Sequence, residues 1–234
     1  MIILRSLVLW IVGSVWFLFS FFILVFCLVL FSREFSYQVC RRLFRFLVAL
    51  MGIRLRIEGA QHMDKQRTYI IMGNHQSLFD IFIIPCAIPY SFVGIEAAYH
   101  FRFPLWGYLI KKWGNIPIER EDRSSAIQSL KQAAGIVKQG RSIGVLPEGH
   151  RTRTGRLGSF KKGPFYLAKE AGADILPFGI HGLYEYQKRG AFRIYPGNVR
   201  IRVGPPIPFR EIEHLPVNEM SELLRQRIQE LIDP

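Results

Sequence analysis

The chain has 234 residues, half of them hydrophobic and 14% aromatic, which is enough for one domain with a sizeable core and excludes an intrinsically disordered chain. Lysine and arginine number 31 against 18 acidic residues, and this net charge of +13 predicts attraction to polyanions or to anionic lipid surfaces. The three cysteines (Cys27, Cys40 and Cys86) form no CxxC pair, which argues against a disulfide framework or a zinc knuckle and fits a reducing compartment.

An uncharged and almost wholly apolar run of 27 residues extends from Ser6 to Ser32. As a helix it would be ~40 Å long against ~30 Å of hydrocarbon, so it can cross a bilayer with tilt. A cleaved signal peptide would have a shorter apolar region and a cleavage site of small residues, whereas this run ends in Phe-Ser-Arg-Glu. We therefore expect a retained membrane anchor.

Basic residues flank this run unequally, with only Arg5 before it. Because an excess of basic residues marks the cytoplasmic side, we expect an inner-membrane protein whose active site faces the cytoplasm. The stretch 37–53 reads as an amphipathic helix, either lying on the membrane interface with its arginines near lipid phosphates or packed on the domain. In a third arrangement both helices dip into one leaflet as a hairpin. The basic residues after the run are Arg33, Arg41, Arg42 and Arg45.

From Arg54 onward, short β-type runs alternate with helical ones. This alternation predicts an α/β domain over residues 54–234, with a mostly parallel central sheet flanked by helices, behind an N-terminal membrane anchor over residues 1–53. The expected elements are an edge strand at 54–58, strands at 69–72, 142–146 and 174–180, a hairpin at 193–203, and helices at 78–87, 124–139, 164–171 and 219–232.

Several familiar sequence patterns do not indicate a functional site in this chain. The segment around Ser142 matches the G-x-S-x-G elbow of hydrolases, but here a helix precedes the serine and a strand follows it, the reverse of what the elbow needs. The glycines of 158–163 have P-loop spacing but are followed by Pro-Phe. The six histidines form no HExxH or HxH pair, so no metal is indicated, and without a recognition motif we expect no nucleic-acid partner.

The segment from Gly73 to Asp80 follows a predicted buried strand, at the sheet edge where ligands of such folds bind. His75 falls at a turn entering a helix, and Asp80 lies five residues on. The carboxylate can then reach back to one ring nitrogen, fix the tautomer and leave the other nitrogen as a general base. The alternative is an N-terminal helix cap by Asn74 with an incidental aspartate.

A second polar segment, Pro147 to Arg153, follows another predicted strand. A glutamate, an arginine and exposed backbone amides at a strand end can hold an anion, since the guanidinium fork binds two phosphate oxygens at once. Each residue taken singly also fits a solvated surface charge. The residues that can contribute to one positive pocket are Glu148, Arg151, Arg120, Lys161 and Lys162.

Together these segments resemble the phospholipid/glycerol acyltransferase family, in particular its bacterial 1-acyl-sn-glycerol-3-phosphate acyltransferases. Four blocks occur in the family's order across residues 70–180. His150 stands where the third block usually has threonine, and it can still donate a hydrogen bond to phosphate. The blocks are N-H-x-x-x-x-D at 74–80, G-x-I-P-I-x-R at 114–120, a form of F-P-E-G-T-R-S at 146–152, and a strand with a proline at 175–178.

The resemblance implies transfer of a fatty acyl group from acyl-CoA or acyl carrier protein to the sn-2 hydroxyl of lysophosphatidic acid, giving phosphatidic acid, with no metal or redox cofactor. His75 would be the general base, and Asp80 would hold it in place. Glu148 would orient an arginine rather than touch the anion. The implied acceptor-phosphate pocket comprises Arg120, Glu148, Gly149, His150, Arg151 and Lys161.

Two other functions stay open. In the first, the acceptor is a different membrane lipid, either another lysophospholipid or an aminolipid, because His150 replaces the threonine that is usual in the third block. In a different class, the chain would be a non-catalytic membrane module that binds anionic lipid through its basic face.

Overall fold

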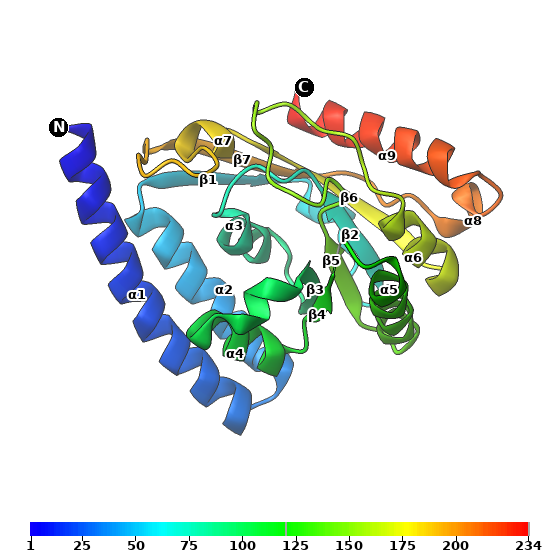
Figure 1. Ribbon diagram of the computed structural model, residues 1–234, viewed down its shortest axis with the longest axis horizontal. Coiled ribbons are helices and arrows are strands. Elements are labelled where there is room, and N and C mark those ends of the chain that lie inside the picture. Colours follow the sequence, from blue (N-terminus) through cyan, green and yellow to red (C-terminus); the bar gives the residue numbers. More distant parts are fainter. Residues whose placement is uncertain (120, 234) are drawn as a thin grey trace.

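A seven-stranded sheet lies at the centre of the molecule with helices on both faces (Figure 1). The computed structural model describes residues 1–119 and 121–233. Neighbouring strands are parallel except β6 and β7, so the predicted α/β class with a mostly parallel sheet is confirmed. In order across the sheet the strands are β1 (Ile53–Glu58), β7 (Gly197–Val203), β6 (Asp174–His181), β2 (Tyr69–Gly73), β5 (Ser142–Val145), β3 (Phe92–Ala97) and β4 (Ile116–Ile118).

Two sets of helices bury the two faces of this sheet. One face is covered by α1 (Ile2–Leu30), α2 (Arg33–Leu50), α3 (Asp80–Ala87), α4 (Pro104–Trp113) and α7 (Leu183–Tyr186). The other is covered by α5 (Arg123–Lys138), α6 (Gly163–Ala171), α8 (Phe209–Ile212) and α9 (Val217–Ile232). The 3₁₀ turns η1 (Ala60–His62) and η2 (Ala98–Arg102) follow β1 and β3.

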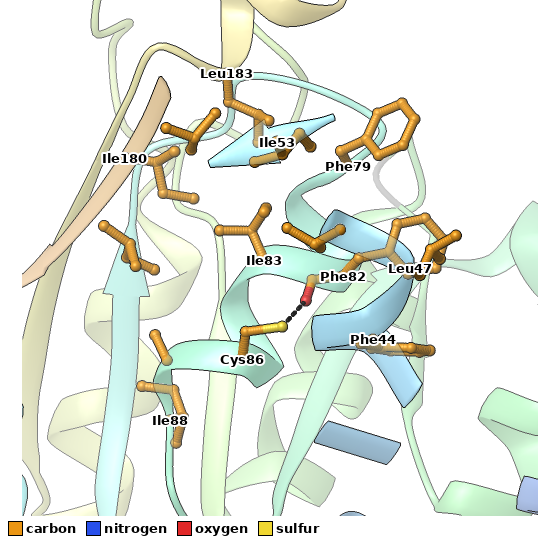
Figure 2. Packing of buried hydrophobic residues seen from close by; sticks show 14 of the residues in the cluster. Phe44, Leu47, Ile53, Phe79, Phe82, Ile83, Cys86, Ile88, Ile180 and Leu183 are labelled. Carbon is orange, nitrogen blue, oxygen red and sulfur yellow. Dashed lines mark hydrogen bonds between the residues drawn. The ribbon is translucent and has the colours of Figure 1, made fainter. Parts of the chain in front are cut away.

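The central strand β2 is buried along its whole length because helices cover both of its faces. Its side chains alternate: Ile71 joins the cluster under α2 and α3, whereas Ile70 and Met72 join the cluster under α5 and α6. Figure 2 shows the first cluster, in which Phe44 of α2 packs edge-on against Phe82 of α3. This packing fixes the start of α3, where the candidate site lies.

The N-terminal run forms a helical hairpin with α2 rather than an isolated helix. One face of α1 carries small residues at intervals of seven, and this face is buried, which lets the helix lie close to its neighbours. A Cβ at Gly13 would lie 2.6 Å from Met51 Sδ. The opposite face of α1 is exposed and apolar. The buried small residues are Ser6, Gly13, Ser20 and Cys27.

Hydrogen bonds also hold α1 to the rest of the molecule. Trp10 Nε1 donates to the Phe192 carbonyl at 2.7 Å, and the Ile194 N–H donates to Ser6 Oγ at 3.0 Å. Of the helices in the described ranges, α1 alone has the length and composition to cross a membrane. It is therefore both an apolar candidate anchor and a packed part of the fold.

Helix α2 packs on the domain, which is one of the arrangements that its sequence allows. Its apolar face, including Cys40 and Phe44, is buried in the same cluster as α3. Arg41 donates to the carbonyls of Pro85 and Cys86, and Arg45 also donates to Cys86. These two arginines thus bind unpaired carbonyls at the C-terminus of α3, a contact that their positive charge suits as well as it suits lipid phosphates.

The structure departs from the predicted elements in two regions. The hairpin at 193–203 is wrong, because the Tyr195 N–H donates to the Tyr186 carbonyl and only β7 is a strand. The region 92–118, for which the sequence predicts no element, contains β3, α4 and β4. β4 has three residues, one of them a proline, and so offers no periodicity to detect. The predicted edge strand β1 and the predicted helices α3, α5, α6 and α9 are present.

Candidate active site

A cavity of about 210 Å³ lies between the sheet and helices α2, α3 and α4. Part of its wall is made by Ile71, Gly144 and Gly94, which are register partners on β2, β5 and β3. A Cβ at Gly144 would lie 2.8 Å from the ring of Phe92, so the glycine is what leaves room there. The remaining lining is mainly apolar and aromatic, and it includes Leu24, Phe44, Ile84, Trp106, Leu109 and Trp113.

His75 and Asp80 line this cavity, and their side chains point to each other. His75 Nδ1 is hydrogen-bonded to Asp80 Oδ2, as the five-residue spacing predicts. The same oxygen accepts the N–H groups of Gln76 at 2.9 Å and Ser77 at 3.2 Å. The Asp80 side chain is 1% exposed and that of His75 is 20% exposed. The carboxylate is therefore fixed, and it holds a proton on Nδ1.

The other ring nitrogen of His75 is the chemically useful one. Its Nε2 has no hydrogen-bond partner among residues 1–119 and 121–233. With Nδ1–H donating to Asp80, Nε2 of the neutral ring is a hydrogen-bond acceptor. The arrangement can take a proton from a hydroxyl placed beside the cavity and stabilise the imidazolium that results.

The loop that carries His75 is fixed by its own polar side chains. Asn74 accepts the Ile180 N–H at 2.7 Å and donates to the Ile180 carbonyl at 2.8 Å. Ser77 Oγ donates to Gln187. Asn74 thus binds β6 rather than capping α3, whose N-cap position is held by Phe79. The alternative of an asparagine cap is excluded.

Glu148 lies at the carboxyl end of β5 and is buried. Its carboxylate accepts the N–H groups of His75 at 2.7 Å and Gly158 at 2.9 Å, while the Thr152 N–H donates to the His75 carbonyl at 2.8 Å. Burial raises the pKa of Glu148, and the two backbone donors offset part of that rise. Within the described ranges Glu148 forms no ion pair with an arginine, and its carboxylate contacts backbone groups that position His75.

The remaining predicted anion-binding residues lie in the same loop region. Gly149 has a φ of +75°, a conformation that favours glycine, and the stem of Lys161 packs over it. The Lys161 N–H donates to the Pro147 carbonyl at 2.8 Å. His150 and the Lys161 side chain are exposed, and Arg151 is half-buried. Arg120 lies outside the described residues.

A second polar cluster lines the cavity and was not singled out in the sequence. Glu96 of β3 accepts hydrogen bonds from Trp106 Nε1 at 3.1 Å and Asn115 Nδ2 at 2.6 Å, and it lies 3.1 Å from His100 Nδ1. In the sequence, this cluster could have been recognised from the four-residue spacing of Glu96 and His100. In the part of the chain described, no group of three or more His, Cys, Asp or Glu is arranged to hold a metal ion.

A family model described as Acyltransferase matches residues 54–181. The chain is 33% identical over 162 residues to the 1-acyl-sn-glycerol-3-phosphate acyltransferase of Limnanthes douglasii, covering 69% of this chain and 57% of that protein. It is 28% identical over 195 residues to the protein of the same name from Borreliella burgdorferi, covering 82% and 77%. The chain thus spans a little over half the length of the plant relative.

The fold is also shared with a solved structure. The crystal structure of the 1-acyl-sn-glycerophosphate (LPA) acyltransferase PlsC from Thermotoga maritima superposes with a TM-score of 0.81 and 22% identity, covering 99% of this chain and 97% of the other. The family match covers more than half of the chain and includes the histidine–aspartate pair and Glu148. The chain therefore belongs to the acyltransferase family.

Proposed function

We propose that this protein transfers a fatty acyl group from a thioester to the sn-2 hydroxyl of lysophosphatidic acid, producing phosphatidic acid in phospholipid biosynthesis. The names of its relatives support this acceptor. The observation that carries the proposal is the His75–Asp80 pair on the wall of an apolar cavity. A general base beside a space that fits a hydrocarbon chain is what acyl transfer to a lipid alcohol requires.

In the proposed reaction, His75 Nε2 takes the proton of the acceptor hydroxyl as that oxygen attacks the thioester carbonyl carbon. The new C–O bond gives a tetrahedral oxyanion, which collapses with cleavage of the C–S bond. The proton then passes from His75 to the departing sulfur, so the imidazole is regenerated. Asp80 stabilises the imidazolium in between through Nδ1–H. General-base catalysis of this kind contributes about 10²–10⁴-fold.

The apolar cavity would hold the acyl chain of the donor. Each buried methylene stabilises the complex by about 0.8 kcal/mol, so a chain of ordinary length gains binding energy along the whole cavity. The activating carrier, coenzyme A or acyl carrier protein, stays outside it. Both carriers are acidic, which suits the basic charge of this chain. No cofactor is required, since the thioester is already activated.

The acceptor phosphate would bind at the loop after β5. Arg151, His150 and Lys161 supply donors there, and the backbone of Gly149 supplies an N–H group. Arg120 belongs to the same proposed pocket from its place in the sequence. Glu148 acts as a positioning residue, because its carboxylate holds the backbone of His75.

We propose further that α1 and α2 enter one leaflet of the inner membrane, with the site facing the cytoplasm. Near its start α1 binds Phe192 and Ile194, which lie beside the exposed Lys188 and Arg189. Further along α1, Phe21 contacts Tyr108 of α4, a helix that also carries the exposed Lys111 and Lys112. Charged residues of the domain therefore accompany α1 along its length, and crossing the bilayer would carry them into hydrocarbon. A hairpin parallel to the surface avoids that cost.

An acyl-transfer assay in detergent tests the function. Purified protein is given acyl-CoA or acyl carrier protein donors with lysophosphatidic acid, other lysophospholipids or an aminolipid, and products are identified by mass spectrometry. We expect phosphatidic acid as the main product, loss of at least about 100-fold in His75→Ala, and no loss in His214→Ala, an exposed histidine. Full activity in His75→Ala contradicts the base assignment. Faster transfer to another acceptor contradicts the substrate, and lipid binding without transfer indicates the non-catalytic module.

A further inference from the structure

The acyl cavity contains polar groups that the proposed reaction does not use. Glu96, His100, Trp106 and Asn115 all line it, in a wall that is otherwise mainly apolar and aromatic. Glu96 comes from β3, His100 from η2 and Trp106 from α4. Polar side chains from separate elements that converge in an apolar cavity are the usual mark of ligand specificity.

The Glu96 carboxylate is fully engaged by the protein. One oxygen accepts Asn115 Nδ2, and the other is shared by Trp106 Nε1 and His100 Nδ1. Asn115 is itself fixed, because its Oδ1 accepts the Gly94 N–H at 2.9 Å. Glu96 therefore has three donors around it and is an orienting group rather than a ligand-binding one.

His100 is the member of this cluster that can still accept a hydrogen bond from a ligand. Because Nδ1–H faces Glu96, Nε2 of the neutral ring is an acceptor, and no residue in the described ranges hydrogen-bonds to it. The ring packs against the aromatic rings of Tyr99 and Phe103. Its side chain is 33% exposed and lines the cavity. Besides His75 Nε2, the described part of the cavity wall thus carries this second oriented acceptor without a protein partner.

This acceptor stands apart from the catalytic pair. His75 follows β2 and Glu96 is near the end of β3, with β5 between them. Two strand spacings place β2 and β3 ~10 Å apart. If the thioester carbonyl of an acyl donor lies at His75, a more distant part of its acyl chain therefore lies beside His100.

A saturated chain at this point would cover His100 Nε2 without giving it a hydrogen bond. An unsatisfied buried polar group costs about 1–3 kcal/mol, whereas a hydroxyl on the chain would donate to Nε2 and remove that cost. Sites built to bind a hydroxyl discriminate strongly against analogues that lack it.

We propose that the Glu96–His100 pair is a selectivity site for acyl donors that carry a hydroxyl group on the chain. This inference rests on the proposed acyltransferase function. His100 contacts the chain hydroxyl, and Glu96 is the positioning residue that holds the ring proton on Nδ1 and leaves Nε2 free to accept.

Competition between donors tests the proposal. The enzyme receives equal amounts of a saturated acyl thioester and a hydroxyacyl thioester of the same length, in a series with the hydroxyl at successive positions, and the products are counted by mass spectrometry. The cost above predicts a preference of about 10-fold for at least one hydroxyl position. In His100→Leu this preference disappears, whereas His100→Gln, which keeps an acceptor, retains part of it. His214→Leu, the same change at an exposed position, keeps the preference of the wild type.

The outcomes separate the two proposals. Transfer from every donor without preference, or a preference that survives His100→Leu, overturns the selectivity site and leaves the acyltransferase function standing. No transfer from any donor contradicts the function itself. A thermal unfolding curve for each variant shows whether a lost preference reflects a lost fold.

Discussion

The cavity holds two histidine–carboxylate pairs that are built in different ways. Asp80 accepts His75 together with two backbone N–H groups of the same loop, so the pair is formed within six residues and its carboxylate is almost fully buried. Glu96 accepts side chains from η2, from α4 and from the turn before β4, and its pair with His100 is more exposed. A pair held by backbone keeps one fixed geometry, which suits proton transfer. A pair held by side chains can differ between related proteins without disturbing the chemistry, which suits selection of a substrate.

The largest expected contrast comes from removing the charge of each carboxylate. Asp80→Asn should lower kcat by at least about 100-fold, because asparagine neither stabilises imidazolium nor holds the proton on Nδ1. Glu96→Gln should cost about 5-fold or less, the worth of one hydrogen bond of about 1 kcal/mol. Steady-state rates with a saturated donor measure both. Equal losses in the two variants would remove the distinction between the pairs.

A change at Arg151 distinguishes binding of the acceptor phosphate from the roles of the two histidine–carboxylate pairs. Arg151→Ala should raise the KM for lysophosphatidic acid about 10-fold and lower kcat less, because it removes a charged hydrogen bond to the phosphate that is present before the reaction begins. Arg153→Ala, an exposed arginine two residues on, is the matched control. An unchanged acceptor KM in Arg151→Ala would exclude this residue from the phosphate pocket.

The space between the two pairs depends on a missing side chain. Gly144→Ala places a methyl group 2.8 Å from the Phe92 ring, so the ring must move. We expect a loss of about 1–3 kcal/mol in stability and poorer use of long acyl donors relative to short ones. Gly135→Ala, where a Cβ meets no atom within 4 Å, serves as the control. Unaltered chain-length dependence would show that the acyl chain does not pass Gly144.

The smallest effect concerns Glu148, which links the loop of His75 to the loop after β5. Its pKa is raised by burial, so the native state binds more protons than the unfolded state between the ordinary glutamate pKa and the raised one. The stability of the wild type relative to Glu148→Gln should therefore fall as the pH increases through that window. Unfolding curves in detergent between about pH 4 and pH 7 measure the difference. Parallel pH profiles for the two proteins would contradict the raised pKa.

The sequence predicts local contacts better than distant ones. The contact of Asp80 with His75 could be predicted because five residues separate them and a helix begins between. The partners of Glu148 could not, since its carboxylate binds backbone N–H groups, one of them 73 residues away, and a backbone donor has no residue type to recognise. The same holds for Arg41 and Arg45, whose positive charge suited lipid as well as the carbonyls at the end of α3.

The Glu96–His100 pair could not be predicted because β3, the strand that carries Glu96, was not predicted. Without β3 and β4 assigned, Glu96 on β3 and Asn115 directly before β4 could not be placed side by side, although Ile95 and Ile116 are register partners. The predicted order of the main strands and helices was nevertheless sufficient to place the catalytic loop at the carboxyl edge of the sheet.

The apolar hairpin has a practical consequence for anyone preparing this protein. Leu24 of α1 is buried and lines the same cavity as His75. A chain shortened at its N-terminus to improve solubility would lose part of that lining and uncover the apolar face of α2. We expect such a shortened chain to stay in solution only if another apolar surface, for example a detergent micelle, covers the region that the deleted segment covered.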